Sequence, residues 1–498
     1  MAKPQSNSYG DFMLLENDFG VLRISSMMKN VQLGAALLFL AFAGASLHGQ
    51  SDEKKIKLET KDVPLGKVSG SAFLDTLVVS ADNRRVAYAG LRGGRWVATV
   101  DGAEGKPYDR VIGLTFSPDG KKVAHVARRE DKWLVVVDGL EGKEYDDIGE
   151  LSLTFSANSK RVAYQAKKGS RWVVVVDGLE GKEYEAIGKS SIAFNSAGTK
   201  VAYVAKKGSR SLVVADGVDG KEYDRVGKMS IAFSPDSSKL SYVAEKAGRW
   251  YAVIDGQESG EFYNLLDGPV VFSPDSKRAG FAGKRGNKYL LVIDGEETRY
   301  YDAAATSLIF FSPDSRQVAY MTKTDEKWSV VTDGKPGQPY DGLGAKVFFS
   351  PDSKRMAYVA RRGNEQRVIL DGNEEPIDDV LGPDGLLFSP DNKRVAYTAK
   401  SGNKWYATVD GVQDKAHPVV GSSTIAFSPD SKLVAYMGEK DGKQKLVVNG
   451  VEGREYIGFI RGSQIIFDGN ARLHALVYRE DETFQMEHVL VEVTVTQE

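Results

Sequence analysis

The sequence predicts an all-β protein made of eleven similar units, and a regular repeat carries this prediction. An anchor residue, usually Phe before a Ser-Pro-Asp-like turn, recurs every 37 to 40 residues. The units hold short runs rich in β-branched and aromatic residues, and these runs show no apolar helical period. The anchors, with Val79 in a degenerate first copy, are Phe116, Phe155, Phe194, Phe233, Phe272, Phe311, Phe349, Phe388, Phe427 and Phe467.

Each unit contains four runs that predict strands, separated by turn signals. Ser117-Pro118-Asp119-Gly120 joins the first two runs of the second copy, because Pro presets φ, Asp bonds back to the backbone and Gly tolerates a positive φ. Asp138-Gly139 joins the last two runs. Four strands in about 40 residues, repeated along a chain, are typical of a β-propeller. In the second copy the runs lie at 114–116, 123–127, 133–137 and 144–148.

The two ends of the repeat region predict a closed ring. The last copy has strand-like runs at 465–467, 474–478 and 488–495 and lacks a fourth run. The segment 62–68 precedes the first copy and has the phase of a fourth strand. Pairing between these ends would close the ring and remove exposed sheet edges. Eleven blades exceed the usual four to eight, so a single large ring and two fused rings both remain open.

The repeated run Phe-Ser-Pro-Asp-x-Lys-Arg-Val-Ala-Tyr resembles the WD40-like propeller repeat of TolB-type periplasmic proteins. The resemblance covers roughly residues 60–498. It implies a β-propeller fold and selects no particular function. The chain lacks the Trp-Asp dipeptide that ends a strand in true WD repeats.

Charge and cysteine content exclude several classes of function. The 498 residues include 66 Lys and Arg against 68 Asp and Glu, which gives a net charge of −2. This balance favours neither nucleic acid nor a membrane surface as a partner. The chain has no cysteine, so disulfides, thiol catalysis and thiolate metal sites are excluded. We predict no cofactor and no metal site.

The N-terminal region predicts export. Residues 28–49 have the order of a secretory signal peptide: a positive start, an apolar stretch at 31–45 and a small-x-small cleavage site at Ala43-Gly44-Ala45. The polar residues 1–27 fit a mis-set start codon, or the short tail of an uncleaved anchor. The repeat domain is expected at 57–498. An exported chain without cysteine fits a bacterial periplasm or the cell exterior, with no stable membrane insertion once the signal is cleaved.

One loop of the repeat combines tryptophan with basic residues. All six tryptophans begin the third run of their copies, a position that predicts packing between blades or a platform for sugars or peptides. The preceding loop is mostly basic and the turn after the third run mostly acidic. This pattern predicts a basic, Trp-bearing face; solvated loop tips are the alternative. The candidate binding residues are Arg95, Trp96, Lys168, Arg171, Trp172, Lys207, Arg210, Trp250, Arg285 and Lys288.

No catalytic motif is found, and we predict no catalytic residue. The five histidines are scattered over the chain, and no Gly-x-Ser-x-Gly, His-Glu-x-x-His or phosphate-binding glycine loop occurs. We therefore expect a non-catalytic scaffold that binds a protein or an anionic polysaccharide through the basic face. The alternatives are a propeller enzyme acting on glycans, as a hydrolase or lyase, and a structural array at the cell surface.

Overall fold

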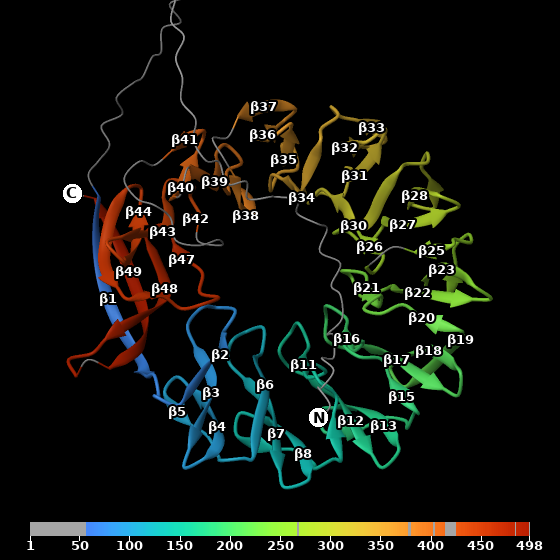
Figure 1. The fold of residues 1–498 in the computed structure, drawn as a ribbon, viewed down its shortest axis with the longest axis horizontal. Helices are drawn as coiled ribbons and strands as arrows, with labels where there is room; N and C mark the ends of the chain where they lie inside the picture. The colour runs from blue at the N-terminus through green and yellow to red at the C-terminus, as the bar shows by residue number, and fades with distance from the viewer. Residues whose placement is uncertain are drawn as a thin grey trace, which may run out of the picture. The chain divides into compact units, whose positions relative to one another are not determined.

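The chain folds into eleven antiparallel sheets, as a computed structural model shows (Figure 1). The structure describes residues 56–265, 268–376, 380–401, 404–413, 425–483 and 485–497. They belong to one compact unit, Lys54–Glu498. This part of the chain contains strands and no helix, so the predicted all-β propeller is confirmed. The segment preceding Lys54, with the predicted signal at 28–49, lies outside the described residues.

The first strand of each blade lies on the inner side of the ring (Figure 1). It is continuous in five blades, β2 (Ala72–Val79), β6 (Arg110–Phe116), β30 (Ala303–Phe311), β34 (Gly342–Phe349) and β38 (Val380–Phe388). It is described as one short strand in blade 10, β42 (Ala426–Phe427). In blades 3 to 6 and 11 it is split into β10 (Asp147–Ile148) with β11 (Thr154–Phe155), β15 (Ala186–Ile187) with β16 (Ala193–Phe194), β20 (Arg225–Val226) with β21 (Ala232–Phe233), β25 (Asn264–Leu265) with β26 (Val271–Phe272), and β46 (Gly458–Phe459) with β47 (Ile466–Gly469).

The second and third strands form the longest hairpin of each blade. The second strands are β3 (Val86–Arg92), β7 (Val123–Arg129), β12 (Val162–Lys168), β17 (Val201–Lys207), β22 (Leu240–Lys246), β27 (Ala279–Arg285), β31 (Val318–Thr324), β35 (Met356–Arg362), β39 (Val395–Ser401), β43 (Val434–Lys440) and β48 (Arg472–Glu480). The third strands are β4 (Arg95–Val100), β8 (Lys132–Val137), β13 (Arg171–Val176), β18 (Arg210–Ala215), β23 (Arg249–Ile254), β28 (Lys288–Ile293), β32 (Lys327–Thr332), β36 (Glu365–Leu370), β40 (Lys404–Val409), β44 (Lys443–Val448) and β49 (Met486–Gln497).

The fourth strands are mostly short, and they form the outer edge. Short charged edge strands discourage pairing with other chains. They are β5 (Ala103–Glu104), β9 (Leu140–Glu141), β14 (Leu179–Glu180), β19 (Val218–Tyr223), β24 (Gln257–Glu258), β29 (Glu296–Glu297), β33 (Lys335–Pro336), β37 (Asn373–Pro376), β41 (Val412–Gln413), β45 (Val451–Tyr456) and, in blade 11, β1 (Ile56–Lys67).

The ring is single and is closed by β1, as the sequence predicts. β1 pairs antiparallel with β49 from Ile56 opposite Gln497 to Lys67 opposite Glu487. Val86 of blade 1 shares a buried apolar cluster with Leu476 and Leu490 of blade 11. The last sheet therefore packs directly on the first. The alternative of two fused rings is wrong, because successive sheets continue around one ring (Figure 1).

The predicted fourth run of the second copy, 144–148, does not form one strand. The outer edge is instead β9, with Tyr145 adding an isolated bridge to Trp133. The chain then crosses to blade 3, where β10 pairs with β12. Ile148 is buried in an apolar cluster that includes residues of blade 3, and this burial favours placement of the segment against blade 3.

The core lies between neighbouring blades. The third strand of blade 3 buries Val173, Val174 and Val175 in succession, so both faces of the sheet are covered. Val174 packs in one apolar cluster with Tyr203 and Leu212 of blade 4. Each sheet is thus held by the next one around the ring.

Two kinds of turn share one face of the ring, here called the turn face. They are the turns between strands one and two, such as 156–161, and those between strands three and four, such as Asp177-Gly178. Asp177 and Gly178 have φ of 52° and 79°, which suits the predicted two-residue hairpin turn. The hairpins between strands two and three emerge on the opposite face, here called the hairpin face, because the strands alternate in direction.

Candidate binding surfaces

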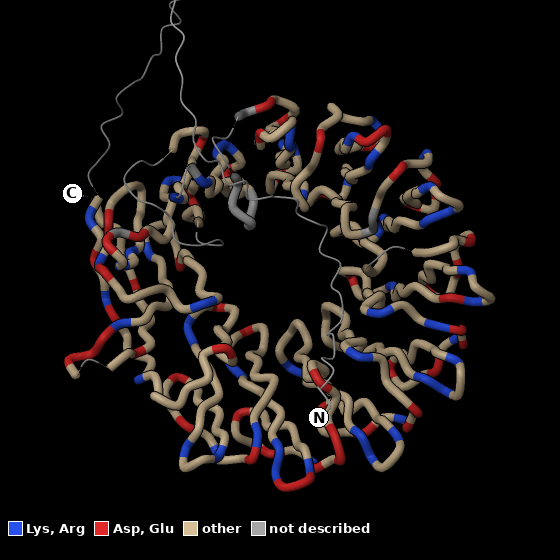
Figure 2. Tube along the Cα trace, viewed as in Figure 1, with Lys and Arg blue, Asp and Glu red and all other residues tan. Residues whose placement is uncertain are grey.

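The seven predicted basic residues lie on the hairpins between strands two and three, and each forms an ion pair. Their partners come from the fourth strand or the connection that follows it. Figure 2 shows positive and negative residues interleaved along the outer parts of the blades. The ion pairs therefore place a carboxylate beside each of these predicted cations. The pairs are Arg95–Asp109 (3.1 Å), Lys168–Glu180 (2.7 Å), Arg171–Glu185 (3.8 Å), Lys207–Asp219, Arg210–Asp224, Arg285–Glu297 (2.8 Å) and Lys288–Asp302.

The acidic partners also tie one blade to the next. Glu180 of blade 3 accepts bonds from Lys143 Nζ (2.6 Å) and Tyr145 Oη (3.2 Å) of blade 2, besides its own Lys168. These hydrogen bonds, that of Lys143 first, lower the pKa of Glu180 to about 2. Glu141 and Asp219 occupy equivalent places in neighbouring blades. The predicted hairpin cations thus take part in contacts that hold the ring together, and their role in binding a partner stays a prediction.

Acid should loosen these ties. The carboxylates of Glu141 and Glu180 have a pKa of about 2 in the folded chain, below the ordinary value of 4.5. A lowered pKa adds stability above the unfolded value, and this stability is lost as the pH falls through the folded pKa. We therefore expect the urea midpoint of unfolding to decrease as the pH is lowered from 4.5 to 2, with a shallower decrease in Glu180→Gln. Midpoints that are constant across this range would contradict the assignment.

The predicted tryptophans are half-buried and covered. Trp172 packs beside the apolar cluster of Tyr203 and Leu212, and Lys167 Nζ lies 5.9 Å from its ring centre. Trp96 stacks on Phe73 at 4.5 Å. Trp250 lies beneath the Arg225 guanidinium at 5.5 Å. Phe73 and Arg225 belong to the same blades as these tryptophans, but each of the three tryptophans also borders an apolar cluster that includes residues of the following blade. This arrangement favours packing between blades over the open platform for sugars or peptides.

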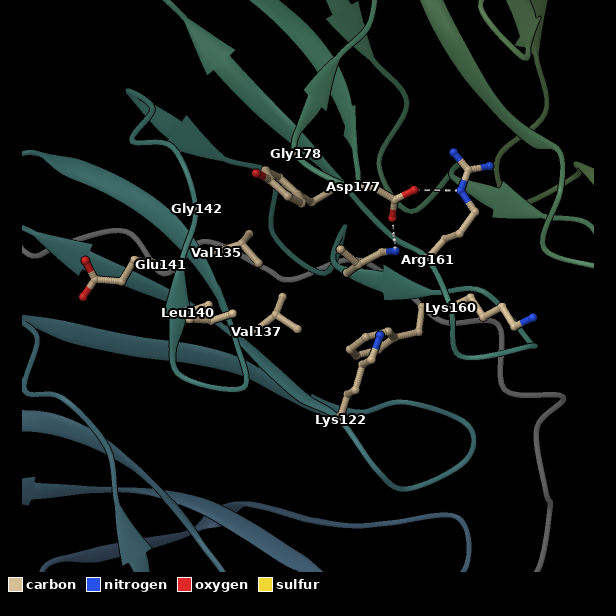
Figure 3. Close-up of a pocket in the computed structure, with 13 residues that line it drawn as sticks. Lys122, Val135, Val137, Leu140, Glu141, Gly142, Lys160, Arg161, Asp177 and Gly178 are labelled. Atoms are coloured by element: carbon tan, nitrogen blue, oxygen red, sulfur yellow. Dashed lines mark hydrogen bonds and ion pairs between the residues drawn. The ribbon is translucent and has the colours of Figure 1, made fainter.

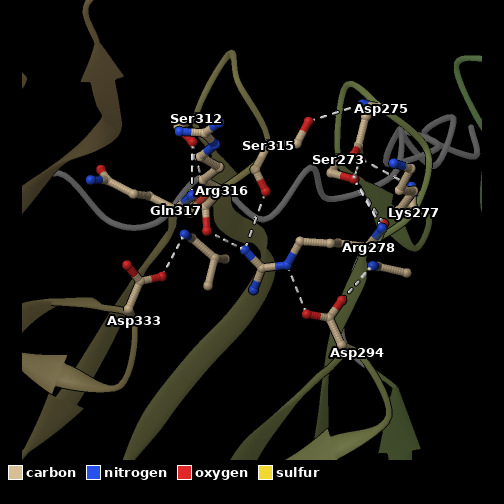
Figure 4. Close-up of polar contacts among 12 residues, drawn as sticks. Ser273, Asp275, Lys277, Arg278, Asp294, Ser312, Ser315, Arg316, Gln317 and Asp333 are labelled. Atoms are coloured by element: carbon tan, nitrogen blue, oxygen red, sulfur yellow. Dashed lines mark hydrogen bonds and ion pairs between the residues drawn. The ribbon is translucent and has the colours of Figure 1, made fainter. Parts of the chain in front are cut away.

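On the turn face, an arginine of one blade contacts the next blade, and we call this contact the arginine clasp (Figure 4). The sequence did not predict it. Arg278 directly precedes β27, the second strand of blade 6, and its Nε donates to Asp294 at 2.8 Å. Its Nη1 donates to the Ser315 and Arg316 carbonyls of blade 7 at 3.3 and 2.8 Å. The guanidinium also lies 5.2 Å from the ring centre of Phe311, the anchor of blade 7. The same clasp is made by Arg85, Arg161, Arg355 and Arg394.

In blade 2, Lys122 occupies the repeat position that the clasp arginine has in other blades. In the part of the chain that the structure describes, the Lys122 amine forms no hydrogen bond or ion pair. The Asp138 carboxylate, which the clasp would engage, accepts a bond from the Val123 backbone N–H alone. Lys200 and Lys239 hold the same position in blades 4 and 5, and their amines donate to carbonyls of the following blade. Blades 2 and 3 are therefore left without this tie.

A groove of about 310 Å³ lies at this boundary (Figure 3). Val135, Val137 and Leu140 of blade 2 line it together with Phe155, the anchor of blade 3. Figure 3 shows Lys122 beside the apolar side chains and the Arg161–Asp177 pair at the other end. The groove opens beside both kinds of turn on the turn face.

The unpaired charges in the groove are positive. Glu141 is engaged by Arg129, Lys106 and Tyr108, and Asp177 is engaged by Arg161. The amines of Lys122 and Lys160 form no bond among the described residues. An acidic group of a partner would therefore be attracted by the free lysine amines, because the carboxylates of the groove are already paired with cations.

A second cavity, of about 540 Å³, lies at the seam between blades 11 and 1. Its charges are largely paired with one another, as in Arg84–Asp468 (2.7 Å) and Lys61–Glu492 (3.2 Å). His474 of blade 11 contacts both blades at this seam: Nε2 lies 2.9 Å from the Asp82 carbonyl of blade 1 and Nδ1 lies 2.8 Å from Asp468. These contacts join the two ends of the ring.

The remaining described histidines lie in the core. His125 and His488 are buried, their ring nitrogens form no hydrogen bond with any described residue, and burial lowers the pKa of each to about 4. His417 falls outside the described residues. Within the described ranges, no three His, Asp or Glu side chains are placed to hold a metal ion. The same ranges contain no helix with the length and apolar character needed to cross a membrane.

Solved structures similar to this chain include other propellers. A crystal structure of the eukaryotic initiation factor is 16% identical over 64% of this chain and 91% of its own, with a TM-score of 0.39. The propeller domain of the Trilobed protease from Pyrococcus furiosus is 16% identical over 55% and 96%, with a TM-score of 0.25. TolB from Acinetobacter baumannii is 16% identical over 61% and 79%, with a TM-score of 0.23.

One of these structures is TolB, the type of protein whose repeat the sequence resembles. No family model matches the sequence, and no curated protein matches it.

Proposed function

We propose that the protein is an exported propeller that acts as a binding scaffold for a partner protein. The groove between blades 2 and 3 is the observation that supports this proposal. It combines an apolar lining from Val135, Val137 and Phe155 with unpaired amines of Lys122 and Lys160. Concave sites with an apolar floor and a few polar groups at the rim are typical binding sites.

Export is the second part of the proposal, and it rests on the sequence of residues 28–49. The apolar stretch at 31–45 and the site at Ala43-Gly44-Ala45 are the features of a cleaved signal. Sequencing of the N-terminus of protein isolated from the periplasm or medium should begin after Ala45 or Gly49. A chain recovered only from the cytoplasm with residues 28–49 intact would contradict this part.

The groove is favoured over the hairpin face as the contact with a partner. The hairpin cations, such as Lys168 and Arg285, are already paired with carboxylates of their own blades. An anionic polysaccharide would have to compete with those carboxylates. The expectation of polysaccharide binding stays a prediction, and so does the alternative of an enzyme acting on glycans.

Site-specific crosslinking tests the scaffold function. A photoreactive residue replaces Leu140, which borders the groove and is 77% exposed. The control replaces Leu179, which is also 77% exposed and has the same repeat position in blade 3, where Arg161 forms the clasp. We expect the full-length chain, irradiated in cell envelope extract, to capture one protein through position 140 and not through 179. Equal capture at both positions, or none, would contradict the proposal.

A further inference from the structure

We infer that the groove between blades 2 and 3 recognises a protein segment in which a large apolar side chain is flanked by carboxylates. This inference rests on the proposed scaffold function and specifies the chemistry of its partner. Three features of the groove carry it: its apolar lining, its unpaired lysines and the absence of the arginine clasp.

The apolar part of the segment fits the lining of the groove. Val137 and Phe155 are partly buried, and Leu140 is largely exposed at the rim. The volume of about 310 Å³ lies at the lower end of the range for ligand pockets. The groove therefore has room for one or two side chains. A leucine or phenylalanine of the partner would remove apolar surface on both sides from water.

The acidic part of the segment fits the free cations. Lys122 and Lys160 lie on opposite blades and both line the groove. The two carboxylates that also line it, Glu141 and Asp177, are each held by an arginine. A carboxylate beside the inserted apolar residue would meet an amine without displacing an existing ion pair. Lys160 is exposed and Lys122 is half-buried, so the attraction should weaken as salt rises.

The repeat explains why this boundary is open. At the equivalent boundary between blades 3 and 4, the Arg161 guanidinium lies 5.6 Å from the ring centre of Phe194 and covers that anchor. Phe155 has no such cover, because blade 2 supplies Lys122. Arginine at this position would reach Asp138 and lie over Phe155, as the clasp does elsewhere. Lys122→Arg should therefore close the groove while keeping its charge.

The other boundaries do not offer the same combination. Lys200 and Lys239 are bonded to the following blade. Gln317 and Leu433 stand at this position in blades 7 and 10 and bring no charge. Of blades 1 to 10, blade 2 alone has at this position a lysine whose amine forms no hydrogen bond or ion pair among the described residues, so the proposed site belongs to a single boundary.

Fluorescence polarisation with the full-length chain tests the inference. The probe is a fluorescein-labelled peptide Asp-Glu-Leu-Phe-Asp-Glu; control peptides replace its acidic residues with Lys or its apolar residues with Ser. We expect saturable binding of the probe alone, weakened by salt. Lys122→Glu and Lys122→Arg should each weaken it by about tenfold or more, since the first reverses the charge and the second closes the groove. Lys200→Glu is the matched control and should stay within about twofold of the parent chain.

Several results would overturn the inference. Equal affinity of the parent chain and Lys122→Arg for the probe would show that the open boundary is not the site. Equal binding of all three peptides would show that the groove does not distinguish acidic and apolar side chains from their replacements. Crosslinking through position 140 that persists unchanged in Lys122→Arg would leave the scaffold function in place and reject this mode of recognition. Absence of any captured partner, with specific peptide binding intact, would reject the scaffold function alone.

Discussion

Deletion of residues 56–67 is expected to lower the melting temperature by roughly 10 °C or more, because it removes β1 and opens the ring. Leu58 packs on the apolar cluster that joins blades 10 and 11, and Val63 packs on the cluster that joins blades 11 and 1. The deletion also strips Arg454 and Arg479 of their shared partner Asp62, whose side chain is only 6% exposed. The long strand β49 would be left as a free edge prone to association. Thermal unfolding and light scattering measure both effects.

Substitutions on the outer side of β1 provide the control for this deletion. Lys57 and Glu59 are exposed and pair mainly with each other, at 3.7 Å. Their joint replacement by serine keeps the strand pairing with β49 and should change stability by less than about 1 kcal/mol. A deleted chain that melts like the parent chain would contradict closure of the ring through β1.

Replacement of Tyr184 by alanine is expected to cost about 3–5 kcal/mol of unfolding free energy, the usual range for a buried aromatic side chain. Tyr184 is 1% exposed, and it packs in the cluster shared by blades 3 and 4. Its hydroxyl donates to Asp219 of blade 4 at 2.7 Å. Tyr184→Phe keeps the packing and removes this bond to a charged acceptor, so it should cost about 1.5 kcal/mol. Urea denaturation of the three chains separates the two contributions.

Trp172→Ala serves as the comparison for this series. Trp172 is half-buried, in contrast to Tyr184, and we expect its removal to cost less than that of Tyr184. A Tyr184→Ala chain that loses less than about 1 kcal/mol, or less than Trp172→Ala, would contradict the assignment of the core to the space between blades.

The period of the sequence predicts the fold, because each copy brings its own strands and turns. Anchors such as Phe155 end the first strand, and Asp177-Gly178 adopts the turn that this pair favours. The missing fourth run of the last copy likewise predicts the pairing of β1 with β49. The fourth strands were harder to place, since residues such as Tyr145 have high strand propensity but insert between blades.

The surface could not be predicted in the same way, because its partners lie in different copies. Lys143 and Glu180 are far apart in sequence, yet neighbouring blades bring them to 2.6 Å. Loop composition alone gives a basic face and an acidic face, whereas the packed blades pair those charges. The groove did leave a signal in the sequence: Lys122 stands where Arg85 and Arg161 occur in the adjacent copies. Lys200, Lys239, Gln317 and Leu433 also stand in place of arginine at this position, so only the contacts in the structure distinguish the boundary at Lys122.

A crystal structure of the full-length chain with the peptide Asp-Glu-Leu-Phe-Asp-Glu would show whether the absent clasp leaves a specific site between blades 2 and 3. We expect an apolar peptide side chain between Val137 and Phe155, with a peptide carboxylate within hydrogen-bond distance of the Lys122 or Lys160 amine. A peptide bound instead over Lys168 and Arg171 on the hairpin face, or at another blade boundary, would contradict this site.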